Sequence, residues 1–369
     1  MKYFIITGEA SADLHASNLV LELKKLDPNS SFYGFGGDLM EAAGVKLSMH
    51  YKELAVMGVV DVLKNIFSIA KKLAFCKKEI ERIQPDALIF IDFSGFNLRI
   101  AKWAKEHQYN THYYIAPQVW ASRSKRVKKI KAYINHLYCI LPFEVDFYKK
   151  HNYEVEFVGH PLIDALALKP IKNSEQFRRE HQLPMDKELI ALLPGSRRSE
   201  LTKILSSMLS IVELFKEFHF VVAMAPSLDR ELYKQFTKNT NVSLVSNDTY
   251  SLLKASKAAL VTSGTATLET ALLKIPQIVC YKTQGLTYWI AKRIIKLPYI
   301  SLVNIILGRE AVPELIQSDL NTKRLQSEFK KLLDTNTTQK QIEAYDQLEV
   351  LLGEGGASRK AAAAILKNS

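Results

Sequence analysis

The sequence predicts an α/β protein built from two tandem units, each a parallel sheet with crossover helices. Short apolar segments with β-strand character alternate along the chain with amphipathic helical patterns, an order typical of parallel strands joined by helices. The series occurs twice, on either side of a polar, proline-containing linker at residues 168–174. The length of 369 residues also exceeds the usual size of a single hydrophobic core.

The first series predicts a domain over residues 1–167. Its strand-like segments are residues 2–7, 87–92, 111–115 and 136–140. Apolar side chains recur at helical spacing between them, in residues 13–26, 59–83 and 96–107. The alternation therefore indicates a Rossmann-like arrangement in this part of the chain.

The second series predicts another Rossmann-like domain over residues 168–338. Its expected strands are residues 188–193, 219–225, 242–245, 258–262 and 277–281. Its expected helices are residues 199–215, 228–236, 250–255 and 265–273. Helical sequence then runs from residue 323 to 367, and residues 339–369 form a third, C-terminal segment.

Composition and charge narrow the class of protein. The chain is 47% hydrophobic and 24% charged, which is ordinary for a globular protein. Its three cysteines lie far apart, so neither a disulfide framework nor a cysteine-type zinc site is expected. Such cysteine usage is typical of a protein in the reducing cytosol. No apolar run approaches the ~18 residues of a membrane span. A net charge of +12 indicates anionic partners, and the densest basic segment is residues 123–131.

Polar residues at the strand ends of the first series are candidate site residues. Glu9 and Ser11 follow the first strand, and Asp13 can cap the helix after it. Asp92 ends a wholly apolar strand, where a carboxylate is costly to bury unless it is paired or used, so it is a candidate general base. A tight turn explains Glu9 and Ser11 equally well, and helix capping is the alternative for Asp92.

The residues that follow two strands of the second series are suited to bind phosphate. Pro-Gly-Ser at residues 194–196 makes a turn with exposed amides before a helix, and Arg197 adds a forked cation. Small hydroxylic residues follow the strand at 258–262, and Glu269 lies about one turn into the next helix, in reach of sugar hydroxyls. The alternative for Arg197 is an ordinary arginine on a surface turn, and the alternative for Glu269 is a solvated glutamate on a helix.

Together these residues favour a nucleotide-sugar glycosyltransferase. One unit would hold a nucleotide diphosphate and the other would supply a base, across a cleft between them. No Asp-x-Asp and no His-Glu-x-x-His pattern is present, so no metal or other cofactor is expected. The charge of the leaving group would then be stabilised by Arg197 and helix ends.

Seven ordered motifs resemble those of lipid-A-disaccharide synthases, a family of two-domain GT-B glycosyltransferases. They are Gly-Glu-Ala-Ser (8–11), Leu-Ala-Val-Met-Gly (54–58), Tyr-Ile-Ala-Pro-Gln-Val-Trp-Ala (114–121), Leu-Pro-Phe-Glu (141–144), Val-Gly-His-Pro (158–161), Leu-Pro-Gly-Ser-Arg (193–197) and Ser-Gly-Thr-Ala-Thr-Leu-Glu (263–269). The resemblance runs along nearly the whole chain. It implies transfer of diacylglucosamine from UDP to the 6-hydroxyl of diacylglucosamine 1-phosphate, forming the β-1,6 disaccharide of lipid A with inversion at the anomeric carbon.

The resemblance also implies roles for single residues. Asp92 is the expected base, with Glu9 as its alternative. The expected UDP-binding residues are Gly195, Ser196, Arg197, Ser263, Gly264, Thr265, Ala266, Glu269 and Asn304, and the expected acceptor-side residues are Ser11, Met57, Gly58 and Trp120. Departures from the family pattern include Ala12 in place of a glycine and Gly95 in place of a second aspartate near Asp92.

Lipid substrates imply a peripheral enzyme on the cytoplasmic face of the inner membrane. An apolar stripe within residues 59–73 includes Ile66 and Phe67 and is interrupted by lysines such as Lys71 and Lys72. We interpret it as a membrane-insertion surface, with a core-facing helix as the alternative. The resemblance further implies that the terminal helices pack back on the N-terminal domain or on a second subunit of a homodimer.

Two other classes of protein compete with this interpretation. A UDP-sugar 2-epimerase or a different UDP-sugar transferase would share the nucleotide-binding half without needing a lipid surface. A basic module that binds nucleic acid or membrane would need no base. No recognised nucleic-acid motif is present, so no nucleic-acid partner is expected.

Overall fold

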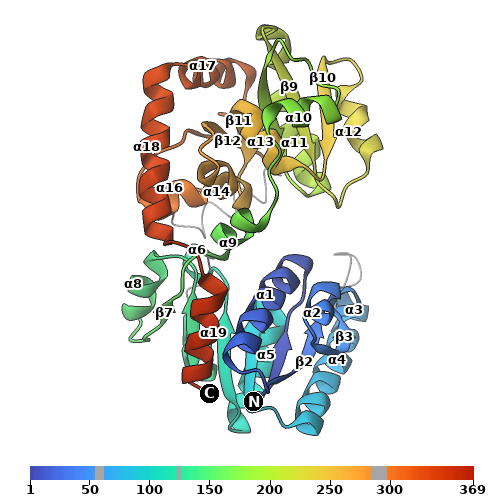
Figure 1. Cartoon of the computed structure of the whole chain (residues 1–369), viewed down its shortest axis with the longest axis vertical. Helices are drawn as coiled ribbons and strands as arrows, with labels where there is room; N and C mark the ends of the chain where they lie inside the picture. The colour runs from blue at the N-terminus through green and yellow to red at the C-terminus, as the bar shows by residue number, and fades with distance from the viewer. Residues whose placement is uncertain (55–61, 123–125, 284–296) are drawn as a thin grey trace. The chain divides into compact units, whose positions relative to one another are not determined.

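Two separate parallel sheets organise the chain in the computed structural model, which describes residues 1–54, 62–122, 126–283 and 297–369 (Figure 1). The first unit comprises Met1–Ala165 and Leu352–Ser369, and the second comprises Leu166–Leu351. The chain therefore leaves the first unit within α9 (Pro161–Leu168) and returns at the end of α18 (Thr335–Leu352). Residue 339, the predicted start of the C-terminal segment, lies within α18 in the second unit.

The first sheet has seven strands in the order β3-β2-β1-β4-β5-β6-β7, and every pair is parallel. The strands are β1 (Lys2–Ile6), β2 (Ser31–Gly36), β3 (Lys46–His50), β4 (Ala87–Ile91), β5 (Asn110–Tyr114), β6 (His136–Cys139) and β7 (Glu156–Phe157). The order reverses between β1 and β4. This is the arrangement of a doubly wound fold, with its topological switch point at those two strands.

Helices connect and cover these strands. They are α1 (Ala10–Leu26), α2 (Asp38–Ala42), α3 (Tyr51–Leu54), α4 (Val62–Ile83), α5 (Ser94–Glu106), α6 (Val119–Ser122), α7 (Val127–Tyr133), α8 (Phe143–Lys149) and α19 (Ala357–Lys367). Figure 1 shows α19, in red, beside α1, and the two helices are in contact. Small side chains such as Ala16 and Ala361 are buried in the same cluster, which suits a close approach of the two helices.

Both faces of the first sheet are buried because its strands present apolar side chains alternately to either side. Phe4 and Ile6 of β1 belong to the core cluster with α4 and α5. Tyr3 and Ile5 of the same strand belong to the cluster with α1 and α19. Continuous apolar runs therefore predicted the central strands correctly.

β2 is a strand that the sequence pattern did not predict. Its sequence, SFYGFG, contains two glycines, which indicate a loop or turn when only the sequence is known. In the structure Gly34 has a φ of +152°, and a Cβ there would lie 1.9 Å from the carbonyl oxygen of Ile5 in β1. Glycine is needed for the close approach of two strand backbones at this position.

The second sheet has six strands in the order β10-β9-β8-β11-β12-β13, again with all pairs parallel. The strands are β8 (Glu188–Leu193), β9 (Phe218–Met224), β10 (Val242–Ser246), β11 (Ser256–Thr262), β12 (Gln277–Tyr281) and β13 (Glu314–Ile316). Its switch point lies between β8 and β11. The predicted second series of parallel strands is thus confirmed, and the short edge strand β13 is added to it.

The second sheet is also covered on both faces. Its helices are α10 (Ser174–Glu180), α11 (Arg198–Leu209), α12 (Arg230–Thr237), α13 (Thr249–Ala255), α14 (Thr265–Leu272), α16 (Leu302–Leu307), α17 (Thr322–Leu332) and α18. Ile190 and Leu192 of β8 pack in one cluster, while Leu189, Ala191 and Leu193 pack in the other. Among the described residues, none of the helices is both long enough and apolar enough to cross a bilayer.

Candidate active site

Asp92 and Glu9 follow neighbouring strands of the first sheet. β1 and β4 pair in parallel, with Ile6 opposite Phe90, at the switch point of the sheet. The chain leaves β1 toward Glu9 and leaves β4 at Asp92, so both carboxylates belong to the carboxyl edge of the sheet. Ligands of open α/β sheets bind in the crevice at such a point.

The backbone at Asp92 has an uncommon conformation that its neighbours hold in place. Asp92 and Phe93 have φ values of 47° and 45°, in the left-handed region. The carbonyl oxygen of Asp92 accepts hydrogen bonds from the Tyr113 hydroxyl and from Nδ2 of Asn97, the latter at 2.8 Å. Nδ2 of Asn97 also lies 3.4 Å from each of the carbonyl oxygens that end β1 and β4. Such over-determined backbone geometry is found at functional sites.

Gly8 allows the loop after β1 to approach the loop after β4. A Cβ on Gly8 would lie 2.2 Å from the ring Cγ of Phe93, a distance that real Cβ atoms do not show. The Phe93 ring is itself stacked on Phe96, with a centroid distance of 5.4 Å, so it cannot easily move away. A glycine before Glu9 is therefore required for the two carboxylates to come close.

The two carboxyl groups interact. Burial, followed by the negative charge of Glu9, raises the pKa of Asp92 to about 6, while a hydrogen bond from the Phe93 N–H lowers it. Glu9 also forms a side-chain hydrogen bond with Asp92, and its Oε1 accepts one from the Ser11 hydroxyl at 2.6 Å. A neighbouring negative charge disfavours the ionised form of a carboxyl group. With a pKa of about 6, Asp92 is still ionised at neutral pH, and it is a better base than an ordinary aspartate.

We expect kcat/KM to rise with pH through about 6, because Asp92 must be ionised to accept a proton and its pKa is about 6. Glu9→Gln removes the nearby negative charge, so the acidic limb should move toward lower pH. Rate profiles between about pH 5 and about pH 8 would measure the shift. The control is Glu175→Gln, at an exposed position of α10 in the second unit. An unmoved limb in Glu9→Gln would contradict the coupling.

Asp13 has a structural role. It is buried within α1, and its carboxylate accepts hydrogen bonds from the backbone N–H groups of Gly37, Leu39 and Met40 at 2.7, 3.1 and 3.2 Å. These donors lie at the start of α2. The prediction that Asp13 caps the helix following β1 was therefore wrong, since the carboxylate caps α2 through a contact that the local sequence does not reveal.

Trp120 lies in α6, after β5, and is half-buried. Its indole Nε1 donates to Oε1 of Glu144 at 3.1 Å, and its ring meets Phe143 edge to face at 4.9 Å. Burial raises the pKa of Glu144 to about 7, while hydrogen bonds from Leu141 N–H and Trp120 lower it. Sequence reasoning gave no role to Glu144. The structure assigns it to hold Trp120 in position.

Other residues predicted for the first unit are only partly described. Met57 and Gly58 lie outside the described residues. Ile66 and Phe67 belong to α4, but their side chains are also outside the described part. Lys71 is exposed, whereas Lys72 is half-buried and donates to the carbonyl oxygen of Glu53.

The phosphate-type turns flank the switch point of the second sheet. β8 and β11 pair with Leu193 opposite Val261, and both turns follow at once. After β8, Gly195 has a φ of 108° and Arg197 occupies the N-cap position of α11, where its side chain makes no capping hydrogen bond. Ser196 and Arg197 are exposed, and the Ser196 carbonyl oxygen accepts from the Ser227 hydroxyl at 3.1 Å.

After β11, small residues lead into α14. Gly264 is exposed, has a φ of 152°, and occupies the N-cap position of the helix that begins at Thr265. Because no side chain caps this helix, its first N–H groups suit anionic oxygens. Ser263 and Ala266 are half-buried, and the Ser263 hydroxyl donates to the carbonyl oxygen of Ile300 at 2.9 Å. The structure thus brings the predicted diphosphate-type turns to one edge of one sheet.

A cavity of about 360 Å³ lies beside α14 and contains Glu269. Its lining residues are Lys169, Pro170, Pro226, Asn247, Asp248, Thr249, Tyr250 and Glu269. Burial raises the pKa of Glu269, while a hydrogen bond from Tyr250 and the charge of Lys169 lower it. The Lys169 ammonium lies 4.9 Å from the centroid of the Tyr250 ring. Sequence reasoning missed Lys169 and Tyr250, which reach the cavity from the linker and from α13.

Asn304 is buried and its amide makes four hydrogen bonds within the unit. Nδ2 donates to the Val312 carbonyl oxygen and to Oε1 of Glu314, both at 2.8 Å. Oδ1 accepts from the N–H groups of Ala311 and Val312 at 2.7 and 3.0 Å. Glu314 also accepts from Ser301, which follows the residue that Ser263 contacts. Asn304 therefore supports the loop at Ile300 and Ser301, beside the diphosphate-type turn. A direct contact between Asn304 and the donor substrate stays a prediction.

The described side chains show no cluster of three or more histidine, cysteine, aspartate or glutamate residues that could hold a metal ion. The first unit brings together Glu9, Ser11 and Asp92, whereas the second brings together the turns at 195–197 and 263–266 with the Glu269 cavity. The former set can remove a proton. The latter can bind an anionic, hydroxyl-bearing ligand.

Comparison with known proteins gives one consistent family. The family model described as lipid-A-disaccharide synthetase matches residues 3–368. A lipid-A-disaccharide synthase of Geobacter metallireducens is 37% identical, with 99% of this chain and 97% of that protein covered. That of Coxiella burnetii is 34% identical, with 97% and 96% covered.

Solved structures of other proteins resemble the fold of this chain. UDP-GlcNAc 2-epimerase from Neisseria meningitidis, bound to UDP-GlcNAc, has a TM-score of 0.67 at 16% identity, with both chains covered completely. A calicheamicin glycosyltransferase has a TM-score of 0.59 at 13% identity, covering 100% of this chain and 98% of that one. The two parallel-sheet units therefore correspond to the GT-B fold, as the sequence predicted.

Proposed function

The chain belongs to the lipid-A-disaccharide synthase family, and we propose that it joins UDP-2,3-diacylglucosamine to 2,3-diacylglucosamine 1-phosphate with inversion at the anomeric carbon. It is a glycosyltransferase of lipid A biosynthesis with the GT-B fold. The observation that carries the proposed chemistry is the Asp92–Glu9 pair at the switch point of the first sheet, where the pKa of Asp92 is raised to about 6.

In this reaction Asp92 acts on the acceptor. Its carboxylate removes the proton of the 6-hydroxyl while the hydroxyl oxygen forms a bond to the anomeric carbon of the donor. The bond from that carbon to the UDP oxygen breaks, and UDP leaves with the bonding electrons. Glu9 is positioned to receive the proton from Asp92, because their carboxyl groups are hydrogen-bonded. A single displacement inverts the configuration and yields the β-1,6 linkage.

The second unit holds the donor nucleotide. Arg197 and the N–H groups at the start of α14 stabilise the negative charge on the departing diphosphate. Glu269 accepts hydrogen bonds from the ribose hydroxyls within its cavity. With this charge stabilisation supplied by the protein, the reaction needs no divalent ion. The basic composition, with a net charge of +12, favours such anionic substrates.

The test is product analysis with both purified substrates in neutral detergent. We expect the β-1,6 disaccharide 1-phosphate and one equivalent of UDP, undiminished by a chelator. Mass spectrometry identifies the product, and proton NMR gives its anomeric configuration. The α-linked product would exclude inversion, and activity abolished by the chelator would exclude metal independence. Conversion of UDP-GlcNAc alone to its 2-epimer, without disaccharide formation, would favour the epimerase alternative.

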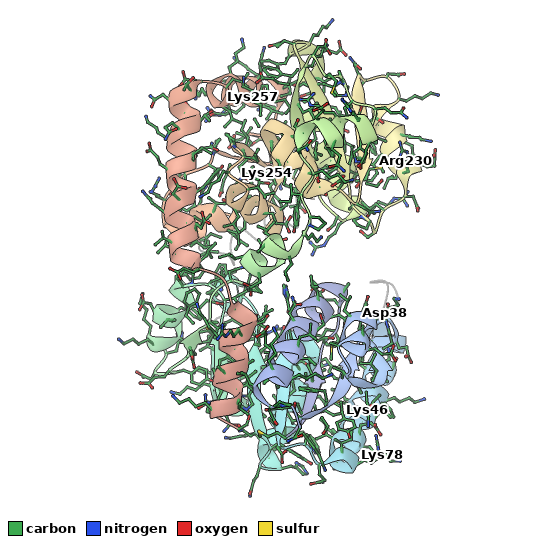
Figure 2. The ribbon with its side chains drawn as sticks, in the orientation of Figure 1. Asp38, Lys46, Lys78, Arg230, Lys254 and Lys257 are labelled. Atoms are coloured by element: carbon green, nitrogen blue, oxygen red, sulfur yellow. The ribbon has the colours of Figure 1, made fainter. Side chains whose placement is uncertain are left out.

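Access to acylated substrates requires contact with a bilayer, and α4 of the first unit is the proposed contact. Lys71 and Lys78 of this helix are exposed, and Figure 2 labels Lys78 at the surface of the unit. Phe75 is 38% exposed, so an apolar side chain accompanies them. Lysines beside apolar side chains suit the cytoplasmic face of the inner membrane, where headgroups are anionic.

Phe67→Asp is expected to weaken sedimentation with vesicles that contain anionic lipid, because a carboxylate replaces an apolar group at the proposed contact. The effect should persist at high salt, whereas Lys71→Ala should matter mainly at low salt. Val350→Asp, at an apolar position of α18 that is 80% exposed, is the control. Equal sedimentation of wild type and Phe67→Asp, with both folded, would contradict the membrane role of α4.

A further inference from the structure

The loop after β5 adjoins the loop that carries Asp92, and its backbone has an uncommon conformation. The carbonyl oxygen of Ile115 accepts a hydrogen bond from the Asp92 N–H at 3.3 Å, just beyond the paired residues Ile91 and Tyr114. Ile115 has a φ of 59°, which is a genuine outlier for a β-branched residue. Such a conformation persists only where the surrounding structure holds it. The position of the Asp92 backbone therefore depends on what fixes the segment that begins at Ile115.

This segment is held on two sides. Ala116 and Val119 are buried in the core cluster with α4 and α5, so they fix its inner side. Trp120 belongs to the same segment and is half-buried. The indole of Trp120 contacts Glu144 and Phe143, which both belong to α8 after the neighbouring strand β6. The outer side of the segment is thus fixed by the next loop along the sheet.

Glu144 is the residue that joins these two loops. Its side chain is buried, with 1% exposed, and its Oε2 accepts a hydrogen bond from the Leu141 N–H at 3.1 Å. Its Oε1 accepts from the indole Nε1 of Trp120, also at 3.1 Å. Both donors are neutral, and a carboxylate buried in this way is costly unless its hydrogen bonds are needed. Because an amide has only one acceptor oxygen, glutamine cannot hold both donors in this geometry.

Similar lateral contacts continue along the carboxyl edge of the first sheet. The loops after β1 and β4 meet where Gly8 approaches the Phe93 ring. The loops after β4 and β5 meet at the hydrogen bond from Asp92 to Ile115, and those after β5 and β6 meet at Glu144. These four strands are neighbours in the sheet. A displacement at Glu144 should therefore reach Asp92 through a single intervening loop.

We propose that Glu144 is a positioning residue for Asp92. By fixing the indole of Trp120, it holds the segment whose carbonyl oxygen at Ile115 binds the Asp92 N–H. This inference rests on the proposed function, since it concerns the base of the same reaction. Glu144 acts through the backbone and not on a substrate. Its loss should therefore lower kcat and leave donor binding by the second unit unchanged.

The first experiment is a double-variant cycle that measures kcat for disaccharide formation in neutral detergent. Glu144→Gln and Trp120→Phe should each lower kcat about 10- to 100-fold, because a small displacement of the base costs up to about 100-fold in rate. The double variant should be no slower than the slower single variant, because both changes break the same contact. The KM of the donor should not change. Asp146→Asn, at an exposed position of α8, is the matched control and should keep the wild-type kcat.

The second experiment needs no turnover. NMR follows the backbone N–H of Asp92 and the indole N–H of Trp120 in protein that contains isotopically labelled aspartate and tryptophan. Asp92→Asn and Trp120→Phe assign the two signals. Glu144→Gln should move both signals, whereas Asp146→Asn should move neither. Thermal unfolding of each variant shows whether it is folded.

An Asp92 signal that stays in place in folded Glu144→Gln would overturn the inference alone. Losses of kcat that multiply in the double variant would also overturn it, because Glu144 and Trp120 would then act independently. Coupled signals in a chain that makes no disaccharide would overturn the proposed function and support this inference. A fall in kcat that Asp146→Asn shares would indicate a general effect on α8, and it too would overturn the inference.

Discussion

Asp92→Asn is expected to lower kcat by about 10²- to 10⁴-fold, the usual contribution of a positioned general base. Asparagine is the sharpest substitution because Asp92 has a φ of 47°, and asparagine tolerates the left-handed region better than alanine does. The amide keeps the size and shape of the side chain but cannot accept the proton. Titration with UDP should give an unchanged Kd. Turnover within a few-fold of wild type would reassign the base, with Glu9 as the next candidate.

The same variant should be more stable than wild type at neutral pH. Asp92 has a pKa of about 6 in the folded protein, above the ordinary 3.8. The unfolded chain therefore releases its proton at lower pH, and the ionised group opposes folding increasingly between about pH 4 and about pH 6. Asparagine does not titrate, so its advantage in thermal midpoint should be full above about pH 6 and small near pH 4. A variant that is less active and less stable would indicate misfolding instead of a lost base.

The sheets were predictable because parallel strands buried on both faces read as continuous apolar runs. β1, β4, β8 and β11 were all found in this way. Four strands were missed, and each carries a weaker signal. β2 contains glycines, β3 has no fully buried residue, and β7 and β13 are only two and three residues long. Strand order was not readable from these runs. The strand order places the turns after β1, β4, β8 and β11 at the two switch points. From the sequence alone, only the chemistry of the residues in these turns indicated a functional role.

The site was predictable where a residue follows a strand directly, and it was not where a residue acts through a distant contact. Asp92 and Arg197 belong to the first class. Asn97 and Tyr113 belong to the second, because they fix the backbone of Asp92 from α5 and β5. Asn304 shows the limit of resemblance, since its amide is engaged by the 311–314 segment of its own unit. Such roles depend on tertiary geometry, and local sequence carries no signal for them.

Arg197→Ala is expected to lower kcat by about 10²- to 10³-fold, comparable to the loss of a group that stabilises developing negative charge. Arg197 is exposed at the N-cap position of α11, where its side chain makes no capping hydrogen bond. Arg197→Lys should recover only part of the activity, because an ammonium lacks the fork that matches a phosphate. Steady-state rates and calorimetric titration with UDP measure the two effects.

Arg198→Ala is the matched control, because Arg198 is also exposed and begins the same helix one residue later. If the position of the charge matters, Arg198→Ala should stay within a few-fold of wild type. Equal losses in both variants would mean that the turn attracts UDP through diffuse charge, and rising salt would then abolish the difference from wild type. A loss in Arg197→Ala that persists at high salt and weakens UDP binding supports direct contact between its guanidinium and the departing diphosphate.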